Sequence, residues 1–198
     1  MIKRLFDLAG SAVLLAALTP LLALAGLWVA LDSPGPVFFR QARLGRGFRP
    51  FLILKFRTMA HQPSRARDDI VFRAPPVTRA GRFLRAWKLD EIPQLWNVLV
   101  GDMSLVGPRP EVPKYVAMFR NDYETILKTR PGLTDPASLK YRNEEALLAA
   151  APDPEKAYIK TILPDKIRLA KEYVKNHSLI EDAKILRKTL FAVLRRGR

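Results

Sequence analysis

Cysteine is absent from this chain of 198 residues, and histidine occurs only twice, at His61 and His177. The first absence excludes disulfide bonds, a thiolate nucleophile and cysteine-based zinc sites, and the second makes a histidine-rich metal site implausible. Any chemistry must therefore be carried by carboxylates and basic side chains. The lack of cysteine also fits a reducing compartment.

Acidic residues are in the minority: 34 lysines and arginines face 19 aspartates and glutamates, which gives a formal net charge of +15. Such an excess favours a polyanionic partner: nucleic acid, anionic lipid or a phosphorylated ligand. Charge alone does not choose among them. The length fits one domain with a core of its own, with or without an appendage.

Charge is missing altogether from residues 8–31, an apolar run of 24 residues. As a helix it would be about 36 Å long, against a hydrocarbon core of about 30 Å. Pro20 falls near its middle, where it removes a backbone donor, and Thr19 supplies a hydroxyl that could satisfy a freed carbonyl. We therefore expect two half-helices that meet at Thr19-Pro20.

The charges on either side of this run predict its topology. Lys3 and Arg4 precede it, and four arginines follow it, at positions 40, 43, 46 and 49. Because positive flanks stay on the cytoplasmic side, we expect the run to dip into one leaflet and return. The alternatives are a straight span, a buried core helix, or a cleaved signal peptide with Ala23-Leu-Ala25 as its cleavage site.

The remaining residues predict a mostly helical α+β fold. Residues 37–39 and 51–56 read as short strands joined through Gly45-Arg-Gly47 into a β-hairpin, and residues 61–76 as a loop over the site. Helices are expected at residues 79–87 (capped by Thr78), 90–100, 111–128, 144–151, 154–174 and 180–196. The last is amphipathic and basic, which suits either a membrane surface or a packing face.

Two adjacent carboxylates, Asp90 and Glu91, precede Pro93 in a pattern typical of a helix N-terminus. Several cations lie beside turns or helix ends, namely Lys55, Arg57, Arg85, Lys88, Arg109 and Arg142. A carboxylate that binds Mg²⁺ or attacks phosphorus, with fixed guanidinium groups around it, is the mixture that phosphoryl transfer needs. Taken in isolation, the acidic pair also fits an ordinary helix cap.

Seven ordered motifs extend this pattern over nearly the whole chain. They are Gly35-Pro-Val-Phe-Phe39, Gln41-x-Arg43-x-Gly45, Lys55-Phe-Arg-Thr-Met59, Leu89-Asp-Glu-Ile-Pro-Gln-Leu95, Asn97-Val-Leu-x-Gly-Asp-Met-Ser104, Val106-Gly-Pro-Arg-Pro110 and Arg130-Pro-Gly-Leu-Thr134. Together they closely resemble the bacterial sugar transferases, the small monotopic phosphoglycosyl transferases.

The resemblance implies an enzyme that moves a sugar-1-phosphate from a UDP-sugar to polyprenol (undecaprenyl) phosphate, releases UMP and initiates bacterial glycoconjugate biosynthesis. It implies a re-entrant membrane helix at residues 1–32, a catalytic domain at residues 33–198, and a location on the cytoplasmic face of the inner membrane, where anionic lipid surrounds the protein. Thr19-Pro20 resembles the Ser-Pro that kinks the family's membrane helix.

Site roles also follow from the resemblance. Asp90 would be the nucleophile that forms a covalent phosphosugar intermediate, Glu91 its partner, and both would hold Mg²⁺. The substrate phosphates and nucleotide would be bound by basic residues, namely Lys55, Arg85, Arg109 and Arg142. Residues 135–143 depart from the family's usual Gly- and Gln-containing version, so the resemblance fixes neither the role of Arg142 nor the sugar.

Two other functions remain open at this stage. One is a single-step transfer in a ternary complex, with Asp90 only as a metal ligand. The other is a basic, membrane-anchored nucleic-acid-binding protein; the transferase hypothesis expects no nucleic acid as a partner. The sequence leaves open the polyprenol length, the glycan built and whether the protein forms a homodimer.

Overall fold

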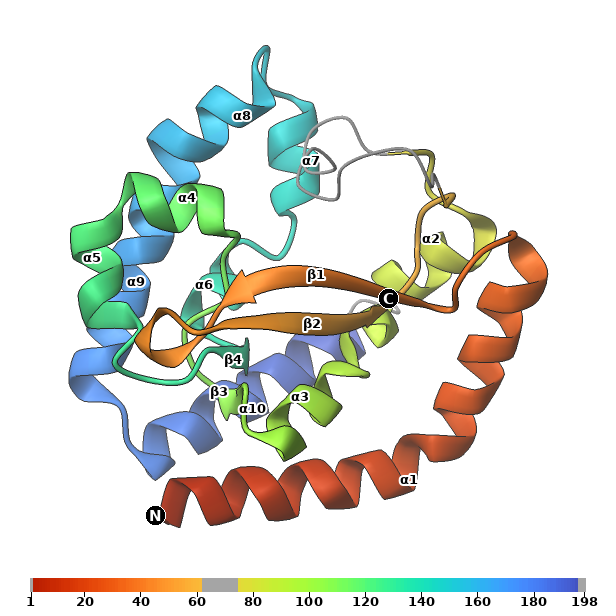
Figure 1. The fold of residues 1–198 in the computed structure, drawn as a ribbon, viewed down its shortest axis with the longest axis horizontal. Coiled ribbons are helices and arrows are strands. Elements are labelled where there is room, and N and C mark those ends of the chain that lie inside the picture. Colours follow the sequence, from red (N-terminus) through yellow and green to blue (C-terminus); the bar gives the residue numbers. More distant parts are fainter. Residues whose placement is uncertain (1, 62–74, 196–198) are drawn as a thin grey trace.

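A computed structural model describes residues 2–61 and 75–195 of the chain. Within these residues the structure is mostly helical, with two small sheets of two strands each (Figure 1). The predicted α+β class is therefore confirmed. Most of the loop expected at residues 61–76 lies outside the described residues.

The apolar run lies in one helix, α1 (Ile2–Asp32), which has 31 residues and contains Pro20. The helix bends near its middle (Figure 1), so the two expected half-helices are the two arms of a continuous, bent helix. The Thr19 hydroxyl donates to the Leu15 carbonyl at 2.7 Å, whereas the carbonyl that a proline at position 20 leaves without a donor is that of Ala16. The hydroxyl therefore bonds one residue away from the expected acceptor.

The apolar surface of α1 is largely uncovered. The helix is long and apolar enough to cross a membrane, and only 11% of its most apolar 18-residue stretch is buried. Ala25 and Val29 pack against a small core with Phe56, but Leu24 and Leu31 are 67% and 78% exposed. This exposure argues against a buried core helix and suggests a membrane anchor.

The predicted hairpin is present. Strands β1 (Phe38–Leu44) and β2 (Pro50–Phe56) pair antiparallel, with Phe38 opposite Phe56, and the short helix η1 (Arg46–Phe48) forms the tip. A second sheet was not predicted: β3 (Ser104–Val106) and β4 (Gly132–Thr134) pair in parallel. Each of these strands has only three residues, too few to show an alternating pattern.

Helices occur in each predicted region, and one short helix at residues 136–140 was not predicted. Helix α2 (Arg79–Ala86) is capped as expected, because the Thr78 hydroxyl accepts from the Gly81 amide at 2.9 Å. The expected helix at residues 111–128 is divided at Phe119, whose φ of −121° and ψ of 37° are not helical. The others are η3 (Leu89–Glu91), α3 (Gln94–Val100), α4 (Pro113–Met118), α5 (Arg120–Ile126), α6 (Pro136–Lys140), α7 (Glu144–Ala149), α8 (Pro154–Ala157), η4 (Tyr158–Ile162), α9 (Leu163–Asn176) and α10 (Leu179–Leu194).

Both ends of α1 are attached to the rest of the fold. At its start, Lys3 pairs with the buried Asp182 of α10 and donates to the Val106 carbonyl at 3.1 Å. Arg4 donates to two carbonyls of α3, those of Val98 (2.6 Å) and Leu99 (2.9 Å). Since these contacts use the charges before the apolar run, the start of α1 lies against the globular part of the chain.

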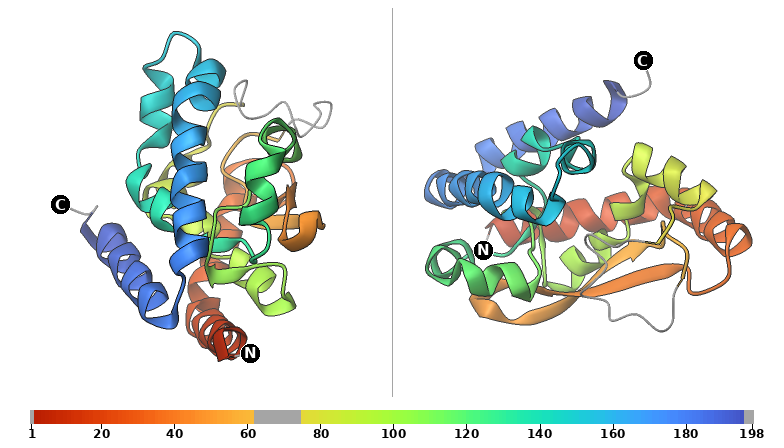
Figure 2. Two further views of the ribbon diagram at one scale, coloured as in Figure 1. Left: turned by 90° about the vertical axis from the view of Figure 1, so that its left-hand side faces the viewer. Right: turned by 90° about the horizontal axis from the view of Figure 1, so that it is seen from above.

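At the other end, the Asp32 carboxylate accepts from the first turn of α2, at 2.9 Å from the Ala80 amide. The Arg57 guanidinium donates to the carbonyls of Val29, Ser33 and Pro34 at 2.6–3.1 Å. The hairpin and α10 lie on opposite sides of the molecule (Figure 2). Because α10 and α3 bind the start of α1, and α2 and Arg57 bind its end, both arms of α1 are held by one globular body.

Candidate active site

The acidic pair lies in η3, the 3₁₀ turn between α2 and α3. Lys88 begins this turn in a left-handed conformation, with φ at 56°. Helix α3 starts only at Gln94, after Pro93. The expectation that Asp90 and Glu91 open a helix that runs to Val100 is therefore wrong: they lie in a separate 3₁₀ turn ahead of α3.

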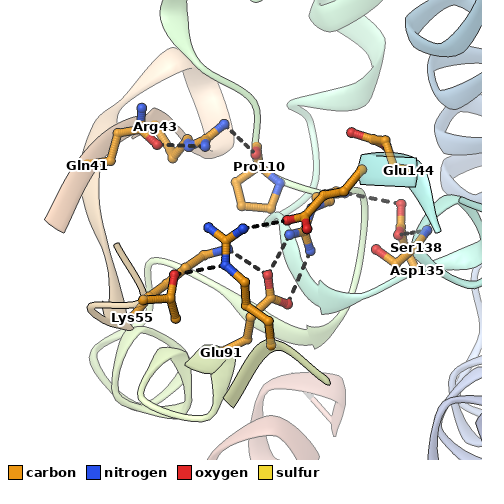
Figure 3. Close-up of polar contacts among 12 residues, drawn as sticks. Gln41, Arg43, Lys55, Glu91, Pro110, Asp135, Ser138 and Glu144 are labelled. Carbon is orange, nitrogen blue, oxygen red and sulfur yellow. Dashed lines mark hydrogen bonds and ion pairs between the residues drawn. The ribbon is translucent and has the colours of Figure 1, made fainter. Parts of the chain in front are cut away.

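Glu91 is bound by two cations from distant parts of the chain. The Nζ of Lys55, on β2, lies 2.6 Å from Oε1, and Arg109, in the loop after β3, places Nη2 2.6 Å from Oε1 and Nη1 3.4 Å from Oε2. Figure 3 shows Lys55 and Glu91 facing each other in this cluster. The fold therefore brings together three of the predicted site residues.

These contacts fix the charge of Glu91. Burial pushes the pKa of Glu91 upward, but Arg109 and Lys55 outweigh it and hold that pKa well below its usual range. The Glu91 carboxylate in turn raises the pKa of Arg109. Glu91 is thus an anion at neutral pH, and its oxygens are already engaged.

Asp90 is in the opposite situation. Its side chain is buried, and its Oδ1 has no hydrogen-bond partner among the described residues. Burial and then the Glu91 charge raise the pKa of Asp90, against the attraction of Lys55, Lys88 and Arg85. An uncompensated buried carboxylate oxygen is costly unless something binds there, which marks Asp90 as a functional group.

The Pro108-Arg109-Pro110 loop is held by Asp135, which sequence reasoning did not assign to the site. Asp135 Oδ2 accepts from the Arg109 amide at 3.2 Å, and its Oδ1 accepts from the Ser138 amide at 2.7 Å as the cap of α6 (Figure 3). The available signal was Asp135-Pro136, a usual helix start.

Two glycines bring this loop against β4. The Gly132 amide donates to the Pro108 carbonyl at 2.9 Å, and the Gly107 amide to the Thr134 carbonyl at 3.1 Å. A Cβ on Gly132 would lie 2.0 Å from the Gly107 nitrogen, so this crossing admits only glycine. The backbone of Arg109 is thereby fixed beside the acidic pair.

The other predicted cations lie further out. The Nε of Arg85 donates to the Thr58 hydroxyl at 2.9 Å, and its Nη1 pairs with the exposed Glu145 at 2.9 Å. Arg142, in the turn between α6 and α7, is half-buried, and in the described part of the chain no hydrogen bond or ion pair joins it to Asp90 or Glu91. Arg57 holds the end of α1 instead of the acidic pair.

One carboxylate of the acidic pair, that of Asp90, has an oxygen without a partner in the described residues and could bind a divalent cation. Within residues 2–61 and 75–195, no group of three or more acidic, histidine or cysteine side chains could hold a metal. Glu91 is occupied by Lys55 and Arg109, whereas the Asp90 oxygen is free. Mg²⁺ in phosphate chemistry commonly takes one or two protein carboxylates and completes its shell with substrate phosphates and water. Asp90 fits that pattern.

A buried carboxylate with an open oxygen, set among fixed cations, has the components of a phosphoryl-transfer site. The model of the family described as "Bacterial sugar transferase" matches residues 1–196. The chain belongs to this family, so the expected transferase class is confirmed.

Three relatives of this chain differ in the sugar that their names give. A UDP-glucose:undecaprenyl-phosphate glucose-1-phosphate transferase of Caulobacter vibrioides is 39% identical over 97% of this chain and 69% of its own length. A UDP-galactose-lipid carrier transferase of Erwinia amylovora is 34% identical over 98% and 41%. A UDP-N-acetylgalactosamine-undecaprenyl-phosphate N-acetylgalactosaminephosphotransferase of Aeromonas hydrophila is 36% identical over 98% and 44%. The chain thus spans less than half of the last two.

Proposed function

We propose that this protein transfers a sugar-1-phosphate from a UDP-sugar to undecaprenyl phosphate, releasing UMP and forming an undecaprenyl diphosphate sugar. The observation that carries the proposal is the buried, open oxygen of Asp90 beside the Glu91–Lys55–Arg109 cluster. The names of the relatives support the substrate classes. Such a reaction would initiate the synthesis of a bacterial glycoconjugate.

The transfer proceeds in two displacements. An Asp90 carboxylate oxygen attacks the phosphorus that carries the sugar, the bond from that phosphorus to the bridging oxygen breaks, and UMP leaves with the electron pair. An undecaprenyl phosphate oxygen then attacks the same phosphorus. The acyl-phosphate bond breaks, Asp90 regains its carboxylate, and the sugar diphosphate is complete.

The cations divide the remaining work. Arg109 and Lys55 hold Glu91, and their charge lies next to the phosphate oxygens that gather negative charge during transfer. The charge of Arg85 acts on Asp90, and its guanidinium forms an exposed pair with Glu145, from which an incoming phosphate could displace it. We place Arg142 on the nucleotide side.

Mg²⁺ fits the site through Asp90, because Glu91 is engaged. When bound, the ion would neutralise charge on the diphosphate of the donor. The proposed ligand set is therefore narrower than the pair expected from the sequence. Asp90 must then serve both ion and phosphorus, which its two carboxylate oxygens allow.

We also propose that α1 is a re-entrant helix on the cytoplasmic face of the inner membrane, and that residues 33–198 lie on that face. Lys3 and Arg4 at one end, and Asp32 at the other, bind the same globular body. A straight span would carry one of these ends across the membrane and break its contacts. An acceptor anchored in lipid would meet a water-soluble donor there.

The test is UMP release by the purified protein with Mg²⁺, undecaprenyl phosphate and UDP-glucose, UDP-galactose or UDP-N-acetylgalactosamine in turn. We expect release with one donor, and a loss of about 1,000-fold or more in Asp90→Asn. Glu172→Gln, an exposed acid on α9, is the matched control and should keep full activity. Release that survives Asp90→Asn would refute the proposal. No observation favours the nucleic-acid alternative.

A further inference from the structure

Two arginines that take no part in the candidate active site converge on the end of α3. Arg4, from α1, donates to the carbonyls of Val98 and Leu99 at 2.6 and 2.9 Å. Arg130, from the segment before β4, donates through Nε to the Gly101 carbonyl at 2.8 Å. Arg4 Nη2 also lies 3.4 Å from where a Cβ on Gly101 would be. Both guanidinium groups therefore lie at one turn.

A third arginine joins them from the hairpin tip. The Gly47 amide donates to the Leu127 carbonyl at 2.8 Å, which sets η1 beside the segment that leads to Arg130. Burial lowers the pKa of Arg130, and the positive charges of Arg46 and Arg4 lower it further. The three side chains, Arg4, Arg46 and Arg130, are called the arginine cluster below.

No carboxylate is paired directly with the arginine cluster in the described part of the chain, although the Asp7 charge acts on Arg130 and raises its pKa against the larger lowering effects. By contrast, Arg43 and Arg109 each form an ion pair with a carboxylate. The buried Asp7 is committed to the Ser104 hydroxyl and the Leu105 amide, both at 3.0 Å. Arginine has five N–H donors, and toward the described residues Arg130 donates through Nε alone, so donors remain for an anion.

Exposed apolar side chains lie on the two helices that meet at this turn, α1 and α3. In the first turn of α1, Ile2 and Leu5 are 71% and 65% exposed, and on α3 Trp96 and Val100 are 56% and 54% exposed. Tryptophan is enriched at membrane–water interfaces, and apolar residues beside arginines suit a ligand with a charged head and an acyl body. A water-soluble phosphate would not need such a rim.

We propose that the arginine cluster binds the phosphate headgroup of an anionic phospholipid. The site is separate from the candidate active site, because within the described residues none of its arginines bonds to Asp90 or Glu91. It rests on the part of the proposed function that puts α1 in the membrane. It gives the start of α1 a fixed position at the lipid headgroups and orients the globular body above them.

The test compares Arg46→Gln with Arg49→Gln. Arg46 is exposed and supports no part of α3, and Arg49 is an exposed arginine in the same turn. Each protein is reconstituted in nanodiscs of phosphatidylglycerol and phosphatidylcholine, extracted in mild detergent, and its retained lipids are counted by mass spectrometry. We expect the unsubstituted protein to retain phosphatidylglycerol preferentially. This preference should fall about fivefold in Arg46→Gln and stay unchanged in Arg49→Gln.

The proposal is overturned if the unsubstituted protein shows no preference for phosphatidylglycerol. It is also overturned if both variants lose the preference equally, because an equal loss indicates diffuse attraction between positive charge and lipid. In a second arm, undecaprenyl phosphate is added to the nanodiscs. If it replaces the retained phosphatidylglycerol, the cluster belongs to the acceptor substrate and the assignment is wrong. UMP release from the same samples separates the two proposals, since lipid retention needs no turnover.

Discussion

Neighbouring carboxylates Asp90 and Glu91 share a turn but have opposite surroundings. The Glu91 carboxylate is paired with Lys55 and Arg109. Asp90 has a buried oxygen without a hydrogen-bond partner among the described residues. Burial raises the pKa of both acids. The charges of Arg109 and Lys55 outweigh it at Glu91 and hold that pKa well below its usual range, whereas the pKa of Asp90 stays raised. Groups separated in this way commonly have separate roles in catalysis.

The role of Glu91 as a fixed anion predicts a pH-dependent stability effect. Glu91→Gln should lower the free energy of unfolding by about 2 kcal/mol at pH 7, because Lys55 and Arg109 lose their shared partner. Since the pKa of Glu91 is lowered on folding, its contribution is fully present above the unfolded pKa of about 4.5 and is lost as pH falls through the folded value.

Urea unfolding in EDTA at pH 7 and near pH 4 measures this difference. The two proteins should differ less at the lower pH. A gap that stays constant or widens on acidification would show that Glu91 acts through packing, not through its charge.

At the scale of single elements, a part of the fold could be predicted when the residues that determine it lie close together in the sequence. The hairpin, the Thr78 cap and most helices were predicted, because their signals lie within a few residues. The β3–β4 sheet and the Asp135 bond to Arg109 were not predicted, because they join residues 28 and 26 positions apart in segments with no shared periodicity. Arg57 was grouped with the site because it is a cation beside a turn or helix end, but its guanidinium donates to the carbonyls at the end of α1.

The crossing of Gly107 and Gly132 yields a prediction at this scale. Gly132→Ala should destabilise the fold by about 3 kcal/mol or more, because the added Cβ would lie 2.0 Å from the Gly107 nitrogen. Gly26→Ala is the control, since a Cβ there meets its nearest atom at an ordinary 3.5 Å. Thermal unfolding of both variants makes the comparison. Equal melting temperatures would mean that the two segments are not in close contact.

At the scale of the whole molecule, the attachment of both ends of α1 carries the topology. Because the chain has no cysteine, Ile2→Cys and Pro36→Cys each introduce a single thiol at an exposed position near one end of α1. With a re-entrant helix, a membrane-impermeant maleimide should label both in inverted vesicles and neither in spheroplasts. Labelling of Ile2→Cys from the outside alone would establish a straight span and refute the proposed topology.

The central claim is that Asp90 carries the sugar phosphate between donor and acceptor. Its most direct measurement is the intact mass of the protein after incubation with Mg²⁺ and the active UDP-sugar, without undecaprenyl phosphate. We predict a mass increase of one sugar phosphate, located on Asp90 by fragmentation and absent in Asp90→Asn. UMP release that requires both substrates, with no adduct trapped under any condition, would contradict the claim and establish single-step transfer in a ternary complex.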